Sequence, residues 1–241
     1  MDLRAEPRRD AELVDQLRFG ERVTLLAERD DWYFVQARED HYFGWIEEAH
    51  TRETDEVPGD GVVTVALAAA TGAPNAQAYD DLPAGTWLDL GGEKNGAIRV
   101  RHPWVNLWVQ ASDITPATEL TPRAPTVNDL LGAARAFLHV PYLWGGTSAK
   151  GIDCSGLVQL AYRLCGVLLT RDADEQATQG REVTDEPRAG DLVFFGSPVA
   201  HVGMYTEAGR MIHAADAPIG HVVEEALADR GAPVSVRRYL P

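Results

Sequence analysis

Short apolar runs, separated by glycine, asparagine and aspartate, fill the first half of the chain. Each run is rich in β-branched and aromatic side chains, and no segment repeats its apolar positions at the helical period of about 3.6 residues. The runs are 22–26, 31–35 and 44–46, followed by a similar set at 87–90, 97–100 and 107–109. This pattern is typical of small all-β domains, so the sequence predicts one barrel at residues 1–55 and a second copy at 56–115.

Proline and threonine separate these two barrels from the rest of the chain. Residues 116–125 read Pro-Ala-Thr-Glu-Leu-Thr-Pro-Arg-Ala-Pro. Because proline removes a backbone donor and restricts the residue before it, neither a helix nor a central strand is expected there. We predict a semi-stiff linker at this place. An acidic stretch rich in turn residues, at 50–61, predicts a tighter junction between the two barrels.

The remaining segment, residues 126–241, has a mixed pattern that begins with helices. One helix is predicted over residues 130–138, because apolar positions follow the capping residues Asn128 and Asp129. A second helix is predicted after Cys154, where apolar side chains recur at helical spacing.

Three runs typical of strands follow these helices, at residues 191–195, 201–205 and 210–214. Residues 207–209, Glu-Ala-Gly, predict a tight hairpin between the last two runs. Because helices come first and strands later, this order favours an α+β domain over an alternating α/β one.

The charge of the chain is strongly acidic, which narrows the choice of partners. It has 22 basic and 37 acidic residues, a net charge of −15, and such a field repels phosphate backbones and anionic lipid surfaces. We therefore expect no nucleic acid and no membrane partner. No apolar run reaches the ~18–20 residues that cross a bilayer. The first residues lack the apolar core of a secretory signal, which predicts a cytoplasmic protein.

Cys154 and Cys165 are the two cysteines of the chain. On one helix, a rise of about 1.5 Å per residue separates them by ~16 Å, far beyond the ~7 Å that a disulfide spans. We expect no disulfide and a reducing compartment. Cys165 lies between Leu164 and Gly166 in the apolar stripe of the helix, which predicts a packing role.

Cys154 has a different setting, because it opens the helix between two polar residues, Asp153 and Ser155. The positive end of the helix dipole and the backbone N–H groups there favour a thiolate. These surroundings point to a nucleophile, although a small buried side chain is the commoner fate of a single cysteine.

Two histidines supply a partner for this cysteine. His201 begins one predicted strand and His213 lies on the next. A hairpin centred on Ala208 pairs position 213 with about 203, which makes the two histidines diagonal neighbours ~7–8 Å apart at Cα. This arrangement fits His201 as a general base and His213 as the group that orients it.

Other uses of the same residues are less well supported. A zinc site built from Cys154, His201, His213 and His221 would match no familiar ligand spacing, and the chain has no HExxH motif. Ser155 lacks the GxSxG turn of serine hydrolases. Nucleotide-binding glycine motifs are also missing, so the sequence predicts no cofactor and no metal.

Six segments resemble, in order, the motif set of the NlpC/P60 cysteine peptidases of bacterial cell walls. They are 141–146 (PYLWGG), 153–158 (DCSGLV), 169–172 (LTRD), 190–195 (GDLVFF), 201–205 (HVGMY) and 212–214 (IHA). The resemblance implies a papain-like α+β catalytic domain at residues 126–241. The two N-terminal barrels resemble bacterial SH3-like domains more loosely.

The resemblance also implies a reaction and a set of catalytic residues. Enzymes of this family cleave peptidoglycan stem peptides, typically between γ-D-Glu and the diamino acid. By this likeness Cys154 is the nucleophile, His201 the general base and His213 the third, orienting member. Tyr142 would lie beside the nucleophile and help to hold the oxyanion.

Several further residues are expected to contact the substrate by the same likeness. Asp153 and Ser155 flank the nucleophile, and Asp172 follows it in the next motif. Because the γ-linkage leaves an α-carboxylate beside the scissile carbonyl, a donor is also needed, and Arg171 is the candidate.

Paired SH3-like domains without an export signal resemble, more narrowly, the enzymes that recycle muropeptides with a free N-terminal L-Ala. In those enzymes an SH3-like domain covers part of the cleft and binds the amine. Glu12 and Tyr42 are the candidates here, with solvated surface and barrel packing as the competing interpretations. The expected partner is thus a small murein peptide. A broader wall hydrolase, a peptidyl or acyl transferase on the same site and a non-enzymatic wall-binding module remain alternatives.

Overall fold

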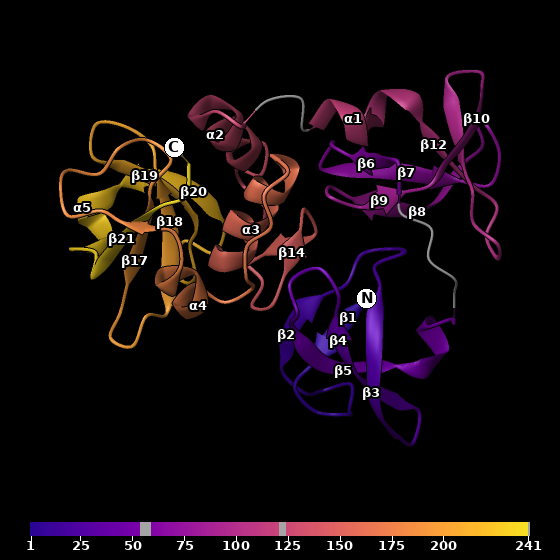
Figure 1. Cartoon of the computed structure of the whole chain (residues 1–241), viewed down its shortest axis with the longest axis horizontal. Coiled ribbons are helices and arrows are strands. Elements are labelled where there is room, and N and C mark those ends of the chain that lie inside the picture. The colour runs from indigo at the N-terminus through magenta and orange to yellow at the C-terminus, as the bar shows by residue number, and fades with distance from the viewer. Residues whose placement is uncertain (54–58, 121–123, 241) are drawn as a thin grey trace.

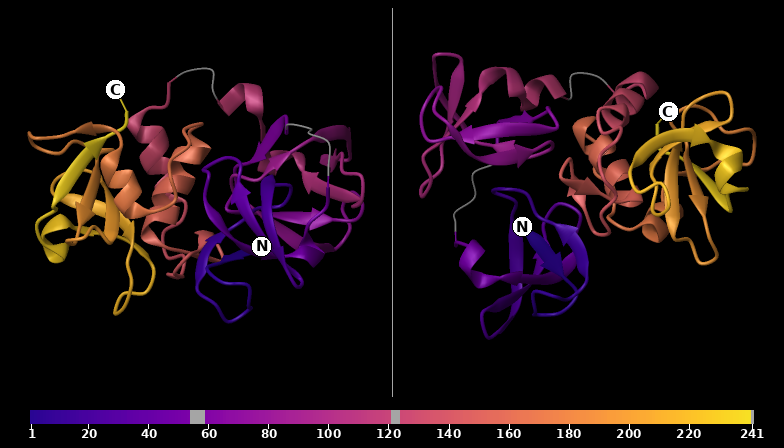
Figure 2. Two further views of the ribbon diagram at one scale, coloured as in Figure 1. Left: turned by 60° about the horizontal axis from the view of Figure 1, so that its bottom comes forward. Right: turned by 180° about the vertical axis from the view of Figure 1, so that it is seen from behind.

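The computed structural model describes residues 1–53, 59–120 and 124–240. Two small β domains come first in the chain and a mixed domain follows them (Figure 1). Both β domains lie on the side of the mixed domain that carries its longer helices, as the views from below and behind also show (Figure 2). This architecture matches the predicted α+β class with two preceding β domains.

The first domain is a five-stranded antiparallel sheet around a small core. Its elements are β1 (Asp2–Arg4), β2 (Leu13–Gln16), β3 (Val23–Arg29), β4 (Trp32–Ala37), β5 (Phe43–Glu47) and a final 3-10 turn, η1 (Glu48–His50). The strand order is β2-β1-β5-β4-β3. Leu3, Val35 and Ile46 are fully buried at its centre, because alternate residues of a strand face inward. The three apolar runs of the sequence correspond to β3, β4 and β5.

The second domain divides its strands between two sheets. They are β6 (Gly61–Val63), β7 (Leu67–Thr71), β8 (Ala78–Pro83), β9 (Trp87–Leu88), β10 (Leu90–Lys94), β11 (Ala97–Val100), β12 (Leu107–Gln110) and β13 (Ile114–Pro116), with a 3-10 turn η2 (Ala111–Asp113). The orders are β10-β11-β12-β7-β8 and β13-β6-β9. Val63, Ala68 and Val109 lie in the core between them.

The predicted junction and the predicted linker each include positions outside the described residues, namely 54–58 and 121–123. Within the described part of the linker, Pro116 closes β13 and α1 (Ala117–Leu120) forms one helical turn. This turn departs from the expectation of no helix. Pro116 stands just before this turn. At the start of a helix the backbone N–H has no helical partner, so a proline there costs no hydrogen bond.

The mixed domain places helices against a six-stranded antiparallel sheet. Its elements are α2 (Val127–Arg135), β14 (Thr147–Ser148), β15 (Gly151–Ile152), α3 (Cys154–Leu164), α4 (Ala173–Thr178), β16 (Arg181–Glu182), β17 (Leu192–Phe195), β18 (His201–Tyr205), β19 (Arg210–Ala214), β20 (Val222–Ala226), α5 (Leu227–Arg230) and β21 (Ser235–Arg238). The sheet order is β16-β21-β17-β18-β19-β20. The first predicted helix thus begins at Val127, because Thr126 and Asp129 form a capping box ahead of the expected cap.

α3 is the central helix of the mixed domain and is buried almost all round, since ten of its eleven residues are buried. Asp153 caps it by accepting a 2.7 Å hydrogen bond from the Gly156 N–H. A Cβ atom on Gly156 would collide with the carbonyl of Gly146, so only glycine allows this close approach. The beginning of the helix is therefore held rigidly against the neighbouring loop.

Buried arginines join the three domains. Arg18, 9% exposed, belongs to the first domain, and it donates to the carbonyl of Ala84 in the second and to that of Thr147 in the mixed domain, each at 3.1 Å. Arg163 on α3 donates to the carbonyl of Gly85 at 2.9 Å and pairs with Glu39 of the first domain. These contacts fix both β domains against the helical side of the mixed domain.

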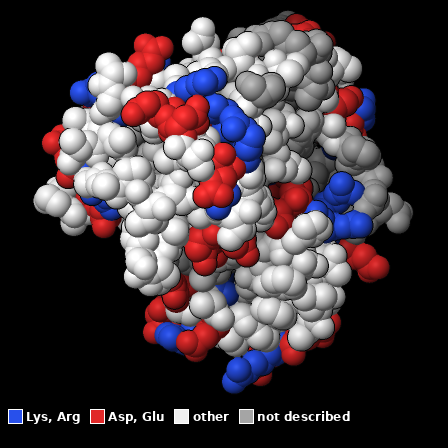
Figure 3. Space-filling model, turned by 60° about the vertical axis from the view of Figure 1, so that its left-hand side comes forward, with Lys and Arg blue, Asp and Glu red and all other residues white. Residues whose placement is uncertain are grey.

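The surface carries both signs of charge. On the face drawn in Figure 3, acidic and basic side chains are interspersed, and no single basic surface gathers there. Within the described residues, no helix is both long and apolar enough to cross a membrane.

Candidate active site

Cys154 is the first residue of α3 and is 6% exposed. Burial raises the pKa of its thiol to about 11, and the neighbouring Asp153 carboxylate acts in the same direction. The Val202 N–H and Arg171 oppose this shift without outweighing it. This shift runs against the thiolate that the helix dipole favours, because loss of water disfavours the anion. Neither Cys154 nor Cys165 forms a disulfide in the described part of the chain.

The two histidines lie where the predicted hairpin puts them. β18 and β19 pair Met204 with Ile212 and Tyr205 with Met211, a register that sets His213 opposite Gly203 and diagonal to His201. The rings stand edge to face, 4.9 Å apart, and His201 Nε2 lies 2.8 Å from His213 Nδ1. Burial, helped by the positive charge of Arg230, lowers the pKa of His201 to about 3. His201 is thus a neutral imidazole near pH 7.

Cys154 lies against the strand that carries His201, because α3 packs on β18. The backbone N–H of Val202, next to His201, contacts the Cys154 sulfur. Tyr142 is also near the cysteine, since burial together with Cys154 and Asp153 raises the pKa of its hydroxyl. The predicted nucleophile, base and oxyanion donor therefore share one place in the fold.

Glu225 joins this group although the sequence analysis did not find it. His213 Nε2 lies 2.8 Å from Glu225 Oε1. Residue 225 is on β20, whose register pairs His213 with Val223. Val222 and Val223 are a weak strand signal, and only the pairing of β20 with β19 shows which of the two following acids faces the histidine.

Arg171 occupies the centre of a buried polar cluster. It donates from Nε to Asp15 at 2.8 Å, from Nη2 to Asp153 at 2.6 Å and from Nη1 to Ser155 at 2.8 Å. Its side chain is 1% exposed. Burial opposes its charge, but Asp153 and Asp15 outweigh burial and raise the pKa of Arg171.

This geometry changes the interpretation of three predicted substrate contacts. Because Arg171 already binds Asp15, Asp153 and Ser155, it is not available as the donor for a substrate carboxylate. Asp153 and Ser155 hold the start of α3 through the same cluster. Asp15, missed in the sequence, ties the first domain to this point, and no local pattern could have indicated a contact across 156 positions.

The two predicted amine-binding residues lie on the first domain where it faces the mixed domain. The Tyr42 hydroxyl donates to Asp172 Oδ2 at 2.9 Å, and burial raises the pKa values of both groups. Glu12 is exposed and accepts a 2.8 Å hydrogen bond from Trp144 Nε1. Tyr42 and Asp172 are thus brought together, whereas Glu12 contacts a residue close to Tyr142 in the chain.

His221 does not join the other histidines. Its Nδ1 is 2.9 Å from the Ile219 carbonyl oxygen, and its ring packs against His139. In the described ranges, no group of three or more His, Cys, Asp or Glu side chains is arranged to hold a metal ion.

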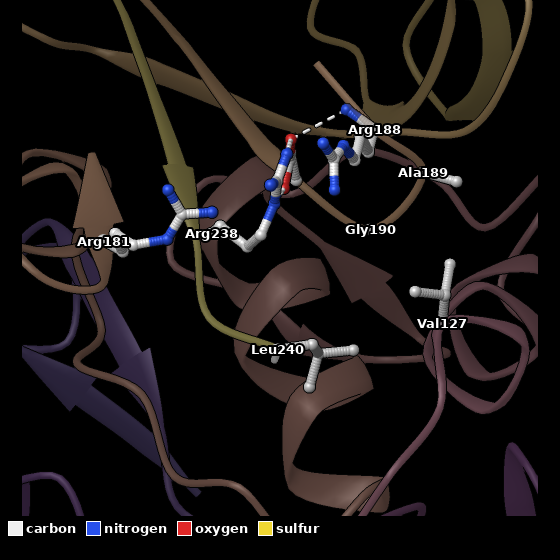
Figure 4. A pocket seen from close by; sticks show the side chains of 8 residues that line it. Val127, Arg181, Arg188, Ala189, Gly190, Arg238 and Leu240 are labelled. Carbon is white, nitrogen blue, oxygen red and sulfur yellow. Dashed lines mark hydrogen bonds and ion pairs between the residues drawn. The ribbon is translucent and has the colours of Figure 1, made fainter. Parts of the chain in front are cut away.

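A cavity of about 240 Å³ lies away from the catalytic residues (Figure 4). Three arginines line it, Arg181, Arg188 and Arg238. Arg238 makes two 2.6 Å hydrogen bonds to Asp191, just before β17. Since His201 pairs with the last residue of β17, this cavity is at the opposite end of that strand.

Family models and relatives of known name match both the catalytic domain and the first β domain of this chain. The NlpC/P60 family model matches residues 139–231, and that of the bacterial dipeptidyl-peptidase SH3 domain matches residues 3–50. The chain is 32% identical over 218 residues to the gamma-D-glutamyl-L-lysine dipeptidyl-peptidase of Bacillus subtilis, which covers 85% of this chain and 73% of that protein. Identity to the Bacillus cereus protein of the same name is 30% over 260 residues, covering 95% and 76%.

A solved structure extends the likeness to the whole arrangement of domains. The crystal structure of an NlpC/P60 family protein from Bacillus cereus has a TM-score of 0.82 at 29% identity, and the match covers 95% of this chain and 83% of that one. Sequence motifs, site geometry and these relatives agree with one another. The chain therefore belongs to the NlpC/P60 family of cysteine peptidases.

Proposed function

We propose that this protein hydrolyses the bond between γ-D-Glu and a diamino acid in small peptidoglycan peptides, and releases L-Ala-γ-D-Glu. The observation that carries the proposal is the contact of Cys154 with the strand that bears His201, which is itself bonded to His213. The relatives from Bacillus subtilis and Bacillus cereus are named gamma-D-glutamyl-L-lysine dipeptidyl-peptidases, which supports this substrate class.

The reaction begins from a neutral thiol and a neutral imidazole. Nε2 of His201 is occupied by His213, so Nδ1 takes the thiol proton while the sulfur attacks the γ-carbonyl carbon. The tetrahedral oxyanion accepts from the Tyr142 hydroxyl, which stays protonated because burial raises its pKa. His201 then gives its proton to the leaving amine, and a γ-glutamyl thioester remains. Water, deprotonated by His201, attacks the thioester and restores the thiol.

A free N-terminal amine suits the side of the site that the first domain covers. Asp172 is partly buried, and burial raises its pKa because its charge loses water. Tyr42 supplies only a neutral hydroxyl to it. A substrate ammonium beside this carboxylate would compensate the lost hydration. Glu12 is a second acid at the same boundary between the two domains, contributed by the first domain at the Trp144 contact.

The test compares L-Ala-γ-D-Glu-L-Lys with its N-acetylated form, using mass spectrometry of the products. We expect cleavage of the free peptide to L-Ala-γ-D-Glu and lysine. Acetylation should lower kcat/KM by about 10- to 100-fold, since a charge-assisted hydrogen bond contributes about 1.5–3 kcal/mol. Equal rates on the two peptides would refute the free-amine requirement, and no cleavage of either would refute the substrate.

A further inference from the structure

Glu225 ends a line of hydrogen bonds that begins at the catalytic base. His201 Nε2 and His213 Nδ1 are 2.8 Å apart, and His213 Nε2 and Glu225 Oε1 are also 2.8 Å apart. His213 is fully buried, and 18% of the Glu225 side chain is exposed. The carboxylate lies two residues beyond Val223, the direct cross-strand partner of His213, so both side chains face the same side of the sheet.

The direction of each hydrogen bond follows from this carboxylate. An ionised carboxylate only accepts, so Nε2 of His213 must carry the proton that lies between them. In a neutral ring Nδ1 of His213 then has a lone pair and accepts the Nε2–H of His201. Nδ1 of His201 is left without a proton, as a base that must take the proton of Cys154 requires.

Other charged groups near the rings do not replace Glu225. Arg230 on α5 disfavours a positive charge on the histidines, whereas Asp216, after β19, favours it. Arg230 and Asp216 also bind each other at 3.1 Å, and neither is hydrogen-bonded to a histidine ring in the described part of the chain. Among the described residues, Glu225 is the one carboxylate hydrogen-bonded to either ring.

We propose that Glu225 is a positioning residue: it fixes His213 in the tautomer protonated at Nε2, and thereby presents the unprotonated Nδ1 of His201 to Cys154. The proposal rests on the peptidase activity proposed above. It adds a fourth member to the Cys154, His201 and His213 set, one that touches neither the substrate nor the reacting atoms.

Loss of the carboxylate frees the proton of His213 to move to Nδ1. His201 Nε2 must then accept, and the proton of His201 moves to Nδ1, where it faces the thiol. In that tautomer His201 cannot act as the base, so the fraction of competent enzyme falls. The loss should lower kcat and leave KM nearly unchanged, because no contact to the peptide changes.

The experiment compares Glu225→Gln and Glu225→Ala with the matched control Glu224→Gln. Glu224 is the neighbouring acid on β20, with similar exposure, but it pairs with Arg135 at 3.1 Å and not with a histidine. On L-Ala-γ-D-Glu-L-Lys we expect kcat to fall about 10-fold for Glu225→Gln and about 100-fold for Glu225→Ala, with KM changed by less than about twofold. Glu224→Gln should stay within about twofold in both.

A second readout does not depend on activity. Nitrogen-15 NMR of the imidazoles reports which ring nitrogen carries the proton. In the unmodified protein we expect His213 to be protonated at Nε2 alone, and in Glu225→Ala a mixture of both tautomers. A proton on Nδ1 of His213 in the unmodified protein overturns the proposal, as does a Glu225→Ala variant with unchanged kcat or tautomer. An unmodified protein that leaves the tripeptide intact would instead refute the proposed function, since the NMR result tests the proton positions separately.

Discussion

Arg171→Met would remove the positive charge that binds two buried acidic side chains, Asp15 and Asp153, while it keeps most of the side-chain volume. Arg171 is 1% exposed, and the side chains of its partners Asp15 and Asp153 are 5% and 8% exposed. Breaking a buried ion pair from one side costs about 3–5 kcal/mol, because the remaining charge is left without a partner. A typical native protein has a free energy of unfolding of only ~5–15 kcal/mol. We therefore expect this one substitution to remove a large part of the stability.

Urea denaturation followed by tryptophan fluorescence measures this loss. Arg9→Met is the matched control, because Arg9 also makes two hydrogen bonds to a carboxylate, at 2.8 and 3.1 Å to Glu47, but its side chain is 83% exposed. An exposed pair contributes about 0–1 kcal/mol. A similar loss of stability for the two variants would refute the claim that Arg171 acts as a buried counter-charge.

Two further predictions follow from the ionisation of the site. Because burial raises the pKa of Cys154 to about 11, its alkylation by iodoacetamide, followed by mass spectrometry, should accelerate about tenfold per pH unit between pH 7 and 10. A plateau already at neutral pH would contradict the neutral thiol. Burial lowers the pKa of His201 to about 3, whereas the unfolded chain takes up the same proton near pH 6.5. The contribution of His201 to the free energy of unfolding is therefore fully present above about pH 6.5. It is lost as the pH falls towards 3, at up to about 1.4 kcal/mol per pH unit. Urea titrations should show a shallower acid slope for His201→Gln, and an identical slope would count against the assignment.

The arrangement of Cys154, His201 and His213 was predictable because it depends on local rules. A capped helix fixes where Cys154 begins α3. The hairpin loop fixes the register of the two histidine strands, and Ala208 and Gly209 adopt the positive φ angles that such a turn needs. From the sequence the register was open by one residue, and such a slip would have put the rings on opposite faces. The pairing of Met204 with Ile212 in the structure confirms the alignment that sets His201 diagonal to His213.

Contacts between distant segments were not predictable in the same way. Glu225 reaches His213 only because β20 pairs with β19, and Asp15 reaches Arg171 only because the first domain docks on the mixed one. The ionisation of Cys154 was also beyond a local rule. The helix dipole is evident from sequence, but the burial that opposes it depends on how α3 packs against the sheet.

Arg18 makes the stability of the first domain depend on the presence of the second. One buried guanidinium of the first domain takes one acceptor from the second domain and another from the mixed domain. A descendant that lost the second domain would leave this cation short of an acceptor, and would have to replace Arg18 to remain stable. We expect relatives with a single N-terminal β domain to carry an uncharged side chain at this position. The second β domain is thus held in the fold partly by a residue that belongs to its neighbour.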